Sequence, residues 1–288
     1  METLNDIISN GNEINILPVW WWAMTRLICE EILTRHKDIL LTPYILWSHR
    51  NAWNKIQYVW REFEFINRDI LSSKISQNNL IAVDYSCWNA VLENITFYIN
   101  NKIDFILWTT WFYTDEKDPA YLETISNIEK SDVLALLSPN MSPEVLMILD
   151  AVRYLWENYP DRLSNFKINI TESHQATKKD TSWTAKKMIE YFRSLGIKAW
   201  IHDINKIRDA VSQVLIWVPE EHLQWHWWHD YKIFSPDRTV EIWFTHNVNW
   251  RQTYVNGTIA AIRFLHEKKI SQKKDEKNIF DMYDVLKS

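Results

Sequence analysis

The sequence predicts an α/β protein with two domains: the first has a parallel sheet, and the second is of α+β type with a mixed, largely antiparallel sheet. Up to Pro139, short apolar runs alternate with helical patterns, as in βαβ units. These runs are apolar at nearly every position, as strands covered on both faces must be. Beyond Pro139, the runs at 231–235 and 239–246 alternate apolar with polar residues, which is typical of an antiparallel sheet with one exposed face.

The first domain is expected to begin with a strand and to continue as alternating helices and strands. Each strand is a short apolar run bounded by polar turns, and helical stretches lie between the runs. The expected elements are a strand at 14–19, a helix at 23–34, a strand at 39–46, a hairpin pairing 55–59 with 62–65, and strands at 80–83, 105–107 and 133–137.

The second domain is expected to begin with a long helix and to contain the densest cluster of polar residues in the chain. The expected elements are a helix at 143–158, a strand at 166–171, a helix at 184–195, the two alternating strands, a last helix at 253–268 and a short tail at 280–286. We therefore expect a first domain at 1–141, completed by the segment 253–288, and a second domain at 142–252.

Composition and charge favour a globular protein of the cytoplasm. The chain is 47% hydrophobic and 24% charged, and its net charge of −5 gives no electrostatic reason to expect nucleic acid or an anionic membrane as partner. No apolar run approaches the roughly 18 residues of a membrane span, and residues 1–15 are too polar for a signal peptide. Cys29 and Cys87 are too few for a disulfide framework or a structural zinc site, so we expect buried thiols in a reducing compartment.

The balance of tryptophan and glycine is the most unusual feature of the composition. The chain contains 18 Trp and 3 Gly in 288 residues, whereas average usage would give about 20 glycines. Glycine fits where the backbone must adopt positive φ or approach a ligand closely, and tryptophan is the largest side chain. Many tryptophans therefore stand where glycines are expected.

The turn after the first expected strand illustrates the problem. It reads Trp20-Trp21-Trp22-Ala23-Met24 and leads into a helix. With glycine at 20 and 22 it becomes G-x-G-x-M, a Rossmann-type turn whose backbone N–H groups meet a pyrophosphate at the helix N-terminus. With tryptophan it is a hydrophobic strand end. The residues alone leave both interpretations open.

Residues 171–185, TESHQATKKDTSWTA, resemble the signature E-x-H-x-x-x-K-x-D-x-S-G-T-A of the 4-hydroxy-tetrahydrodipicolinate (dihydrodipicolinate) reductase family. Every element is present except the glycine, where this chain has Trp183. Other segments resemble family motifs along nearly the whole chain. They are 107–112 (G-T-T-G-F), 138–142 (A-P-N-M-S), 217–222 (G-V-P-E-E-H of the plant-like branch), 249–251 with 256–258 (G-R and N-G-T), and the tail 280–286.

The resemblance places family glycines at seven tryptophans: Trp20, Trp22, Trp108, Trp111, Trp183, Trp217 and Trp250. Our hypothesis is that the source organism reads the UGA codon as glycine and that these residues were translated with a table that assigns UGA to tryptophan. The alternative is a decayed paralogue in which the tryptophans are genuine. Thr25 is a further departure, because a third glycine is usual there and the codon does not explain it.

The resemblance implies NAD(P)H-dependent reduction of 4-hydroxy-tetrahydrodipicolinate to tetrahydrodipicolinate, a step of diaminopimelate and lysine biosynthesis. Hydride delivery builds charge on the substrate ring, and a proton must neutralise it. His174 and Lys178, four residues apart in a polar loop beyond a strand, are implied to be the catalytic acid and charge-stabilising groups. Without the resemblance, they would be interpreted as a solvated surface pair.

The substrate is a small dicarboxylate, and the expected groups for its two carboxylates lie in two segments. Gln175, Ser182, Trp183 and Thr184 form the first set, and the last three stand at the start of a helix, whose N–H groups favour anions. Arg251 is the candidate for the second carboxylate because a guanidinium fork matches its geometry. A surface salt bridge is the alternative role for Arg251.

NADPH or NADH is the expected cofactor. Arg50 with Ser48, which follow the second strand where no carboxylate is available for a ribose hydroxyl, favour NADPH. His226 and His229 are expected to be a hydrogen-bonded pair, and no metal is expected. The expected cofactor-binding residues are Trp20, Trp22, Ala23, Met24, Arg50, Trp108, Thr109, Thr110, Ser138, Asn140 and Met141.

The resemblance also implies a homotetramer assembled through the sheet of the second domain. Two alternatives remain open from the sequence. One is another two-domain dehydrogenase of a small carboxylate, against which the spacing of His174, Lys178 and Ser182 argues. The other is an inactive oligomeric paralogue whose tryptophans fill the cofactor cleft.

Overall fold

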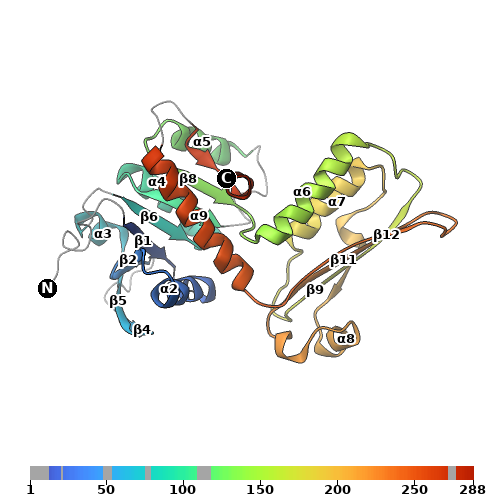
Figure 1. Cartoon of the computed structure of the whole chain (residues 1–288), viewed down its shortest axis with the longest axis horizontal. Coiled ribbons are helices and arrows are strands. Elements are labelled where there is room, and N and C mark those ends of the chain that lie inside the picture. Colours follow the sequence, from blue (N-terminus) through green and yellow to red (C-terminus); the bar gives the residue numbers. More distant parts are fainter. Residues whose placement is uncertain (1–12, 21, 48–53, 75–78, 109–117, 272–276) are drawn as a thin grey trace. The chain divides into compact units, whose positions relative to one another are not determined.

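The computed structural model describes residues 13–20, 22–47, 54–74, 79–108, 118–271 and 277–288 (Figure 1). Contacts between Cα atoms divide the chain into two compact units. The first unit comprises Met1–Met141 and Tyr254–Ser288, and the second comprises Ser142–Thr253. Each unit has its own sheet and its own helices.

The first unit is a nine-stranded sheet, counted over the described residues, in the order β13-β8-β7-β6-β1-β3-β5-β4, with β2 also paired to β1. All pairings are parallel except that of β4 with β5. The strands are β1 (Ile14–Val19), β2 (Ile39–Leu41), β3 (Tyr44–Leu46), β4 (Lys55–Tyr58), β5 (Arg61–Ile66), β6 (Leu80–Asp84), β7 (Asp104–Trp108), β8 (Ala135–Ser138) and β13 (Ile279–Phe280). The helices are α2 (Ala23–Arg35), α3 (Arg68–Lys74), α4 (Trp88–Asn100), α5 (Pro119–Glu129), α9 (Gln252–Ser271) and α10 (Met282–Leu286).

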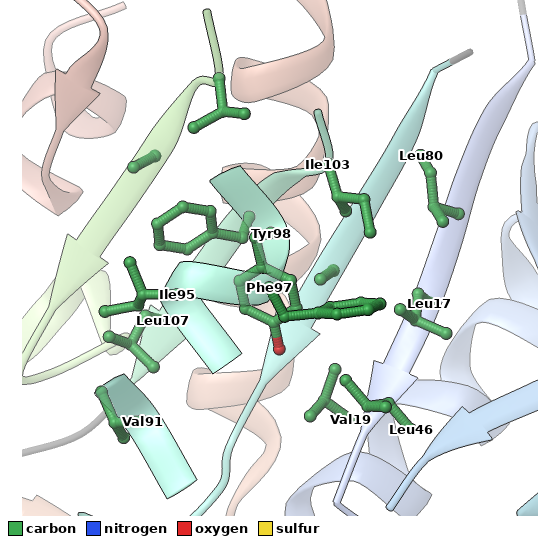
Figure 2. Close-up of a cluster of buried hydrophobic side chains, with 14 of the residues drawn as sticks. Leu17, Val19, Leu46, Leu80, Val91, Ile95, Phe97, Tyr98, Ile103 and Leu107 are labelled. Atoms are coloured by element: carbon green, nitrogen blue, oxygen red, sulfur yellow. The ribbon is translucent and has the colours of Figure 1, made fainter. Parts of the chain in front are cut away.

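The core of the first unit explains why its strands are apolar throughout. All six residues of β1 are buried, and Leu17 packs in one cluster with Tyr98 of α4 and Leu107 of β7 (Figure 2). The strand order reverses at β1, which has β6 on one side and β2 and β3 on the other. Ligands of open α/β sheets bind beyond the carboxyl ends of the strands at such a point.

The second unit is a four-stranded sheet in the order β10-β9-β11-β12. β11 pairs antiparallel with β9 and β12, whereas β10 pairs parallel with β9. The strands are β9 (Lys167–His174), β10 (Ile204–Ile207), β11 (Trp227–Phe234) and β12 (Glu241–Val248), and the helices are α6 (Pro143–Asn158), α7 (Trp183–Ser194) and α8 (Ala210–Leu215). Helices α6 and α7 lie side by side (Figure 1), and Phe192 of α7 contacts Tyr231 and Phe244 on one face of the sheet.

The α/β fold class predicted from the sequence is confirmed, and three details of the prediction are wrong. The expected strand at 39–46 is two strands, because Pro43 has no N–H to continue the ladder. Strand β10 and its parallel pairing were not expected. Strand β9 ends at His174, so that residue lies in the sheet and not in a loop. Among the described residues, no helix is long and apolar enough to cross a membrane.

Trp217 occupies the glycine position of a helix C-cap. The N–H of Val218 donates to the carbonyl of Gln213 at 3.0 Å, and the N–H of Trp217 donates to that of Val214 at 3.0 Å. This is the Schellman motif, in which the residue after the cap is left-handed and usually glycine. Trp217 has φ 72°, and Trp20 has φ 63° in the turn after β1. Both are positions where the resemblance places a family glycine.

We expect Trp217→Gly to stabilise the protein by about 0.5–1 kcal/mol, because it relieves left-handed strain that exceeds the entropy cost of glycine. Trp217 is 86% exposed, so little buried area is lost. Urea denaturation measures the change. The matched control is Trp243→Gly in β12, where the tryptophan is 62% exposed and its φ is not positive. A destabilisation by Trp217→Gly as large as that by Trp243→Gly would contradict the interpretation.

Candidate active site

The turn after β1 contains a left-handed residue, Trp20, leads into α2, and carries large side chains. The N–H of Trp20 donates to the carbonyl of Leu46 at 3.0 Å, and Trp22 is the N-cap residue of α2. The hydroxyl of Thr25 donates to the carbonyl of Trp20, so this departure from the family pattern holds the turn closed. The Trp20 ring is buried and stacks on Trp47 with centroids 4.6 Å apart, whereas Trp22 is 62% exposed. Ala23 and Met24 begin the helix.

The ends of β7 and β8 bring together four more of the expected cofactor residues. The indole N–H of Trp108 donates to the carbonyl of Pro139 at 2.9 Å, and its ring stacks on Tyr254 at 5.2 Å. Ser138 and Asn140 are buried and joined by hydrogen bonds, and Met141 is fully buried. Arg50, with Ser48, and the residues Thr109, Thr110 and Trp111 lie outside the described residues.

The register of the second sheet places titratable groups side by side. Glu172 of β9 lies opposite His229 of β11, which lies opposite His246 of β12. His174 of β9 lies opposite Trp227 of β11. Alternate residues of a strand share one face, so all of these side chains lie on the face that α7 covers. Four of them are buried titratable residues: Glu172, His174, His229 and His246.

The carboxylate of Glu172 is fully buried and satisfied on both oxygens. Its Oε1 forms an ion pair with Nη2 of Arg208, and its Oε2 accepts the backbone N–H of Ser182 at 3.2 Å. The same Oε2 lies 3.8 Å from Nε2 of His174 and 3.9 Å from Nε2 of His229. Burying an isolated carboxylate would be costly, and the Arg208 guanidinium offsets that cost.

The imidazole of His174 is fully buried and held from the backbone. Its Nδ1 lies 3.3 Å from the carbonyl oxygen of His226, which assigns the proton to Nδ1. The backbone carbonyl of His174 accepts a hydrogen bond from the side-chain amide of Gln213 at 2.7 Å. Its Nε2 has no hydrogen-bond partner among the described residues. Burial, with the charges of Lys178 and Arg208, lowers the pKa of His174 to about 2. The imidazole is therefore neutral at pH 7.

Lys178 follows β9 in a turn closed by its N–H donating to the carbonyl of Gln175 at 3.0 Å. Its ammonium pairs with Asp180 at 3.0 Å and lies 5.6 Å from the ring centroid of Trp227. Arg208 donates from Nε to the Lys178 carbonyl at 3.0 Å, so the backbone of this turn is tied to the sheet. Gln175 is half-buried, and its Oε1 has no partner in the part of the chain that the structure describes.

The first turn of α7 is suited to an anion. Ser182 is the N-cap residue, but its hydroxyl makes no cap hydrogen bond, and the buried Oγ has no partner among the described residues. Trp183 is the first helical residue, and the buried Thr184 follows it. The dipole of a helix favours a carboxylate at its N-terminus.

Arg251 is covered by aromatic rings and not by acids. Its guanidinium carbon lies 4.6 Å from the ring centroid of Trp225 and 5.4 Å from that of Trp250, and among the described residues no carboxylate pairs with it. Burial lowers its pKa. Trp225 is stacked on Trp227 at 6.1 Å, and Trp227 meets His174 edge-on at 5.4 Å. We call Trp225, Trp227 and Trp250 the indole stack. Its rings contact Arg251, Lys178 and His174.

The histidines do not form the pair that the sequence analysis expected. His226 accepts from the Ser173 hydroxyl at Nε2, 2.8 Å away, and donates from Nδ1 to the His222 carbonyl at 3.0 Å. Both ring nitrogens of His229 lack a hydrogen-bond partner among the described residues. Glu172, His174 and His229 offer ligand atoms within 4.8 Å of one another. The Glu172 carboxylate is already paired with Arg208, so we interpret the cluster as a polar network, and the absence of a metal stays a prediction.

The chain is similar in sequence to known reductases. The model of the dihydrodipicolinate reductase C-terminus matches residues 150–286. A protein of Oryza sativa subsp. japonica named probable 4-hydroxy-tetrahydrodipicolinate reductase 1, chloroplastic, is 38% identical over 210 residues, which are 73% of this chain and 59% of that protein. The chain belongs to the dihydrodipicolinate reductase family. Its similarity to plant members places it in the plant-like branch of that family.

Other family members match more distantly or over similar lengths. 4-Hydroxy-tetrahydrodipicolinate reductase 1 of Arabidopsis thaliana, chloroplastic, is 37% identical over 220 residues, 76% of this chain and 61% of its own length. The chain thus spans about three fifths of these plant relatives. The solved dipicolinate-bound dihydrodipicolinate reductase from Paenisporosarcina sp. TG-14 shares the fold, with a TM-score of 0.63 at 12% identity over 93% of this chain and 97% of its own.

Sequence reasoning missed four residues of this network. Glu172 was visible as the first letter of the signature, but its role was not. Arg208 and Gln213 follow β9 by more than 30 residues and carry no motif, so only the parallel pairing of β10 with β9 brings them near. His246 could have been found from the alternating pattern of its strand, which sets it on the inner face.

The buried histidines predict that acid destabilises the protein. Burial lowers the pKa of His174 to about 2 and of His246 to about 4, and lowers that of His229 well below its usual range. Below the unfolded pKa of about 6.5, the unfolded chain binds more protons than the folded one, so stability falls as pH falls. Each histidine contributes up to about 1.4 kcal/mol per pH unit.

Urea denaturation between pH 7.5 and 5 measures this effect above the range in which most carboxylates titrate. We expect the free energy of unfolding to fall steadily below about pH 6.5. The control His246→Gln removes one titrating group and reduces the slope. A free energy of unfolding that does not change between pH 6.5 and 5 in the unsubstituted protein would show that these histidines do not change protonation on unfolding.

Proposed function

We propose that this protein is a 4-hydroxy-tetrahydrodipicolinate reductase that uses NADPH or NADH. The observation that supports this most directly is in the second unit: the ion pair of Glu172 and Arg208 holds the Lys178 turn and the start of α7 beside the strand that carries His174. A single region thereby offers a neutral imidazole, an ammonium and the N-terminus of a helix with a buried serine hydroxyl. These suit a small cyclic dicarboxylate on which charge develops.

The roles of the two catalytic candidates follow from their charges. The nicotinamide would supply the hydride. His174 lies on the inner face of the sheet, where its Nδ1 is engaged by the carbonyl of His226 and its Nε2 has no partner among the described residues, so Nε2 is the atom that hydrogen-bonds at the substrate ring. Lys178 carries the positive charge, so it stabilises the charge left on the ring and donates the proton that neutralises it. The start of α7 and Arg251 hold the two carboxylates.

The cofactor fits the backbone of the first unit but not its side chains. The left-handed turn at Trp20 and the start of α2 have the form of a pyrophosphate site, while the indoles of Trp20 and Trp22 stand in it. The indole stack similarly covers Arg251, Lys178 and His174. We propose that the active protein has glycine at the seven family positions, and a small residue also at 225 and 227.

Three finer features are part of the same proposal. We favour NADPH because Ser48 and Arg50 follow the second strand without a carboxylate. The outer face of the second sheet carries exposed residues such as Trp243 and a hollow of about 450 Å³, which supports assembly of a homotetramer through that face. Neither cysteine is in a disulfide, which is compatible with a reducing cytoplasm.

The alternative is an inactive oligomeric paralogue, favoured by the packing of the indole stack if those tryptophans are genuine. Two versions of the chain separate the proposals: one as printed, and one with glycine at positions 20, 22, 108, 111, 183, 217, 225, 227 and 250. We expect the glycine version to oxidise NADPH, and more slowly NADH, in the presence of 4-hydroxy-tetrahydrodipicolinate. We expect the printed version not to bind the cofactor.

Substitutions in the glycine version test the assigned roles. His174→Ala and Lys178→Ala should each lower kcat by about 100-fold or more, because each removes a group that acts on the developing charge. Absorbance of NADPH follows the rate. A glycine version that folds and binds NADPH, yet leaves the substrate unreduced, would refute the reductase proposal.

A further inference from the structure

One ion pair, whose carboxylate is fully buried, connects four segments of the candidate site. Arg208, just after β10, pairs with the Glu172 carboxylate and donates from Nη1 to the Glu172 carbonyl at 3.2 Å. It also donates from Nε to the Lys178 carbonyl at 3.0 Å. Glu172 in turn accepts the Ser182 N–H at 3.2 Å. The pair thus ties β9 and β10 to the Lys178 turn and to the first turn of α7.

We propose that Glu172 and Arg208 are positioning residues that hold the Lys178 ammonium and the α7 anion site in register with His174. This inference deepens the reductase proposal and rests on it. Neither residue needs to touch the substrate. They act through Lys178, whose turn Arg208 fixes, and through Ser182, whose backbone Glu172 fixes.

Energetics favour a positioning role over a purely stabilising one. A buried ion pair recovers its desolvation cost only when the remaining hydrogen bonds are complete, and apolar replacements of similar volume are often as stable. Here the guanidinium makes four hydrogen bonds, three of them to backbone carbonyls. Such a fork fixes loop geometry that apolar side chains could not fix. A displacement of 1 Å at a catalytic group costs about 100-fold in rate.

The titratable neighbours of Glu172 are consistent with this role. His174 and His229 face its Oε2 at 3.8 Å and 3.9 Å, and His246 stacks on His229 at 4.7 Å. Lys178 and Arg208 both act on His174 by lowering its pKa. Removing the Glu172 charge alone would leave the partly buried Arg208 without its carboxylate partner. A single substitution could then lower the rate by destabilising the fold and not by moving Lys178.

The decisive variant is therefore the double substitution Glu172→Gln with Arg208→Met in the glycine version of the chain. Both charges are removed while volume and burial are kept. The matched control is Asp104→Asn with Lys269→Met, which removes an ion pair of the first unit whose carboxylate is also buried. For each variant we would measure kcat, the urea midpoint, the Kd of NADPH and the Kd of pyridine-2,6-dicarboxylate, a planar dicarboxylate.

We expect the double variant to fold with an unchanged Kd for NADPH, while kcat falls at least 10-fold and the dicarboxylate binds at least 10-fold more weakly. The control variant should keep kcat and the Kd of the dicarboxylate within twofold of the values for the glycine version. Unchanged kcat and dicarboxylate binding in a folded double variant would overturn the inference. If no version reduces the substrate, the reductase proposal fails, and the dicarboxylate Kd alone still decides whether the pair positions an anion site. If the double variant does not fold, Arg208→Lys replaces it, with the same expected losses and the same overturning result.

Discussion

The ion pair of Glu172 and Arg208 forms where three strands and two turns meet, and it requires all of them to be in place. The register of β9, β10 and β11 brings the carboxylate beside His174 and His229 and brings the guanidinium to the Lys178 turn. A charge in this position without its partner would be expensive. The sheet and the site are therefore coupled, since a slip of one residue in β9 would turn Glu172 and His174 to the outer face.

The fold could be predicted from the sequence where the apolar pattern was strong. The run Ile14–Val19 and the helix Pro143–Asn158 were found with their ends because burial on both faces and helical periodicity leave clear patterns. The expected strand at 166–171 stops three residues before the end of β9, because the polar residues Glu172 and His174 are typical of a loop. Buried polar residues break the rule that associates polarity with exposure, and functional sites contain them for that reason.

The candidate site was predictable only through motifs. His174, Lys178 and Ser182 lie in one continuous signature, so the sequence brought them together. Arg208 and Gln213 reach the same place through a parallel strand pairing that no local pattern indicates. The tryptophans form a third class: their number was informative, but the cation contacts of Trp225 and Trp227 emerged from the geometry. Left-handed φ at Trp20 and Trp217 provides an independent physical argument for glycine at both positions.

Backbone geometry, ring contacts and family membership converge on one claim: glycine belongs where this chain has tryptophan in the turn after β1 and around the catalytic candidates of the second unit. Peptide mass spectrometry of the native protein, covering residues 20–22, 183, 217 and 225–227, tests it most directly. Glycine masses at 20, 22, 183 and 217, with a small residue at 225 and 227, are the result this account predicts. Tryptophan masses at those positions would contradict it, because indoles would then occupy the turn after β1 and cover His174, Lys178 and Arg251 in the protein itself.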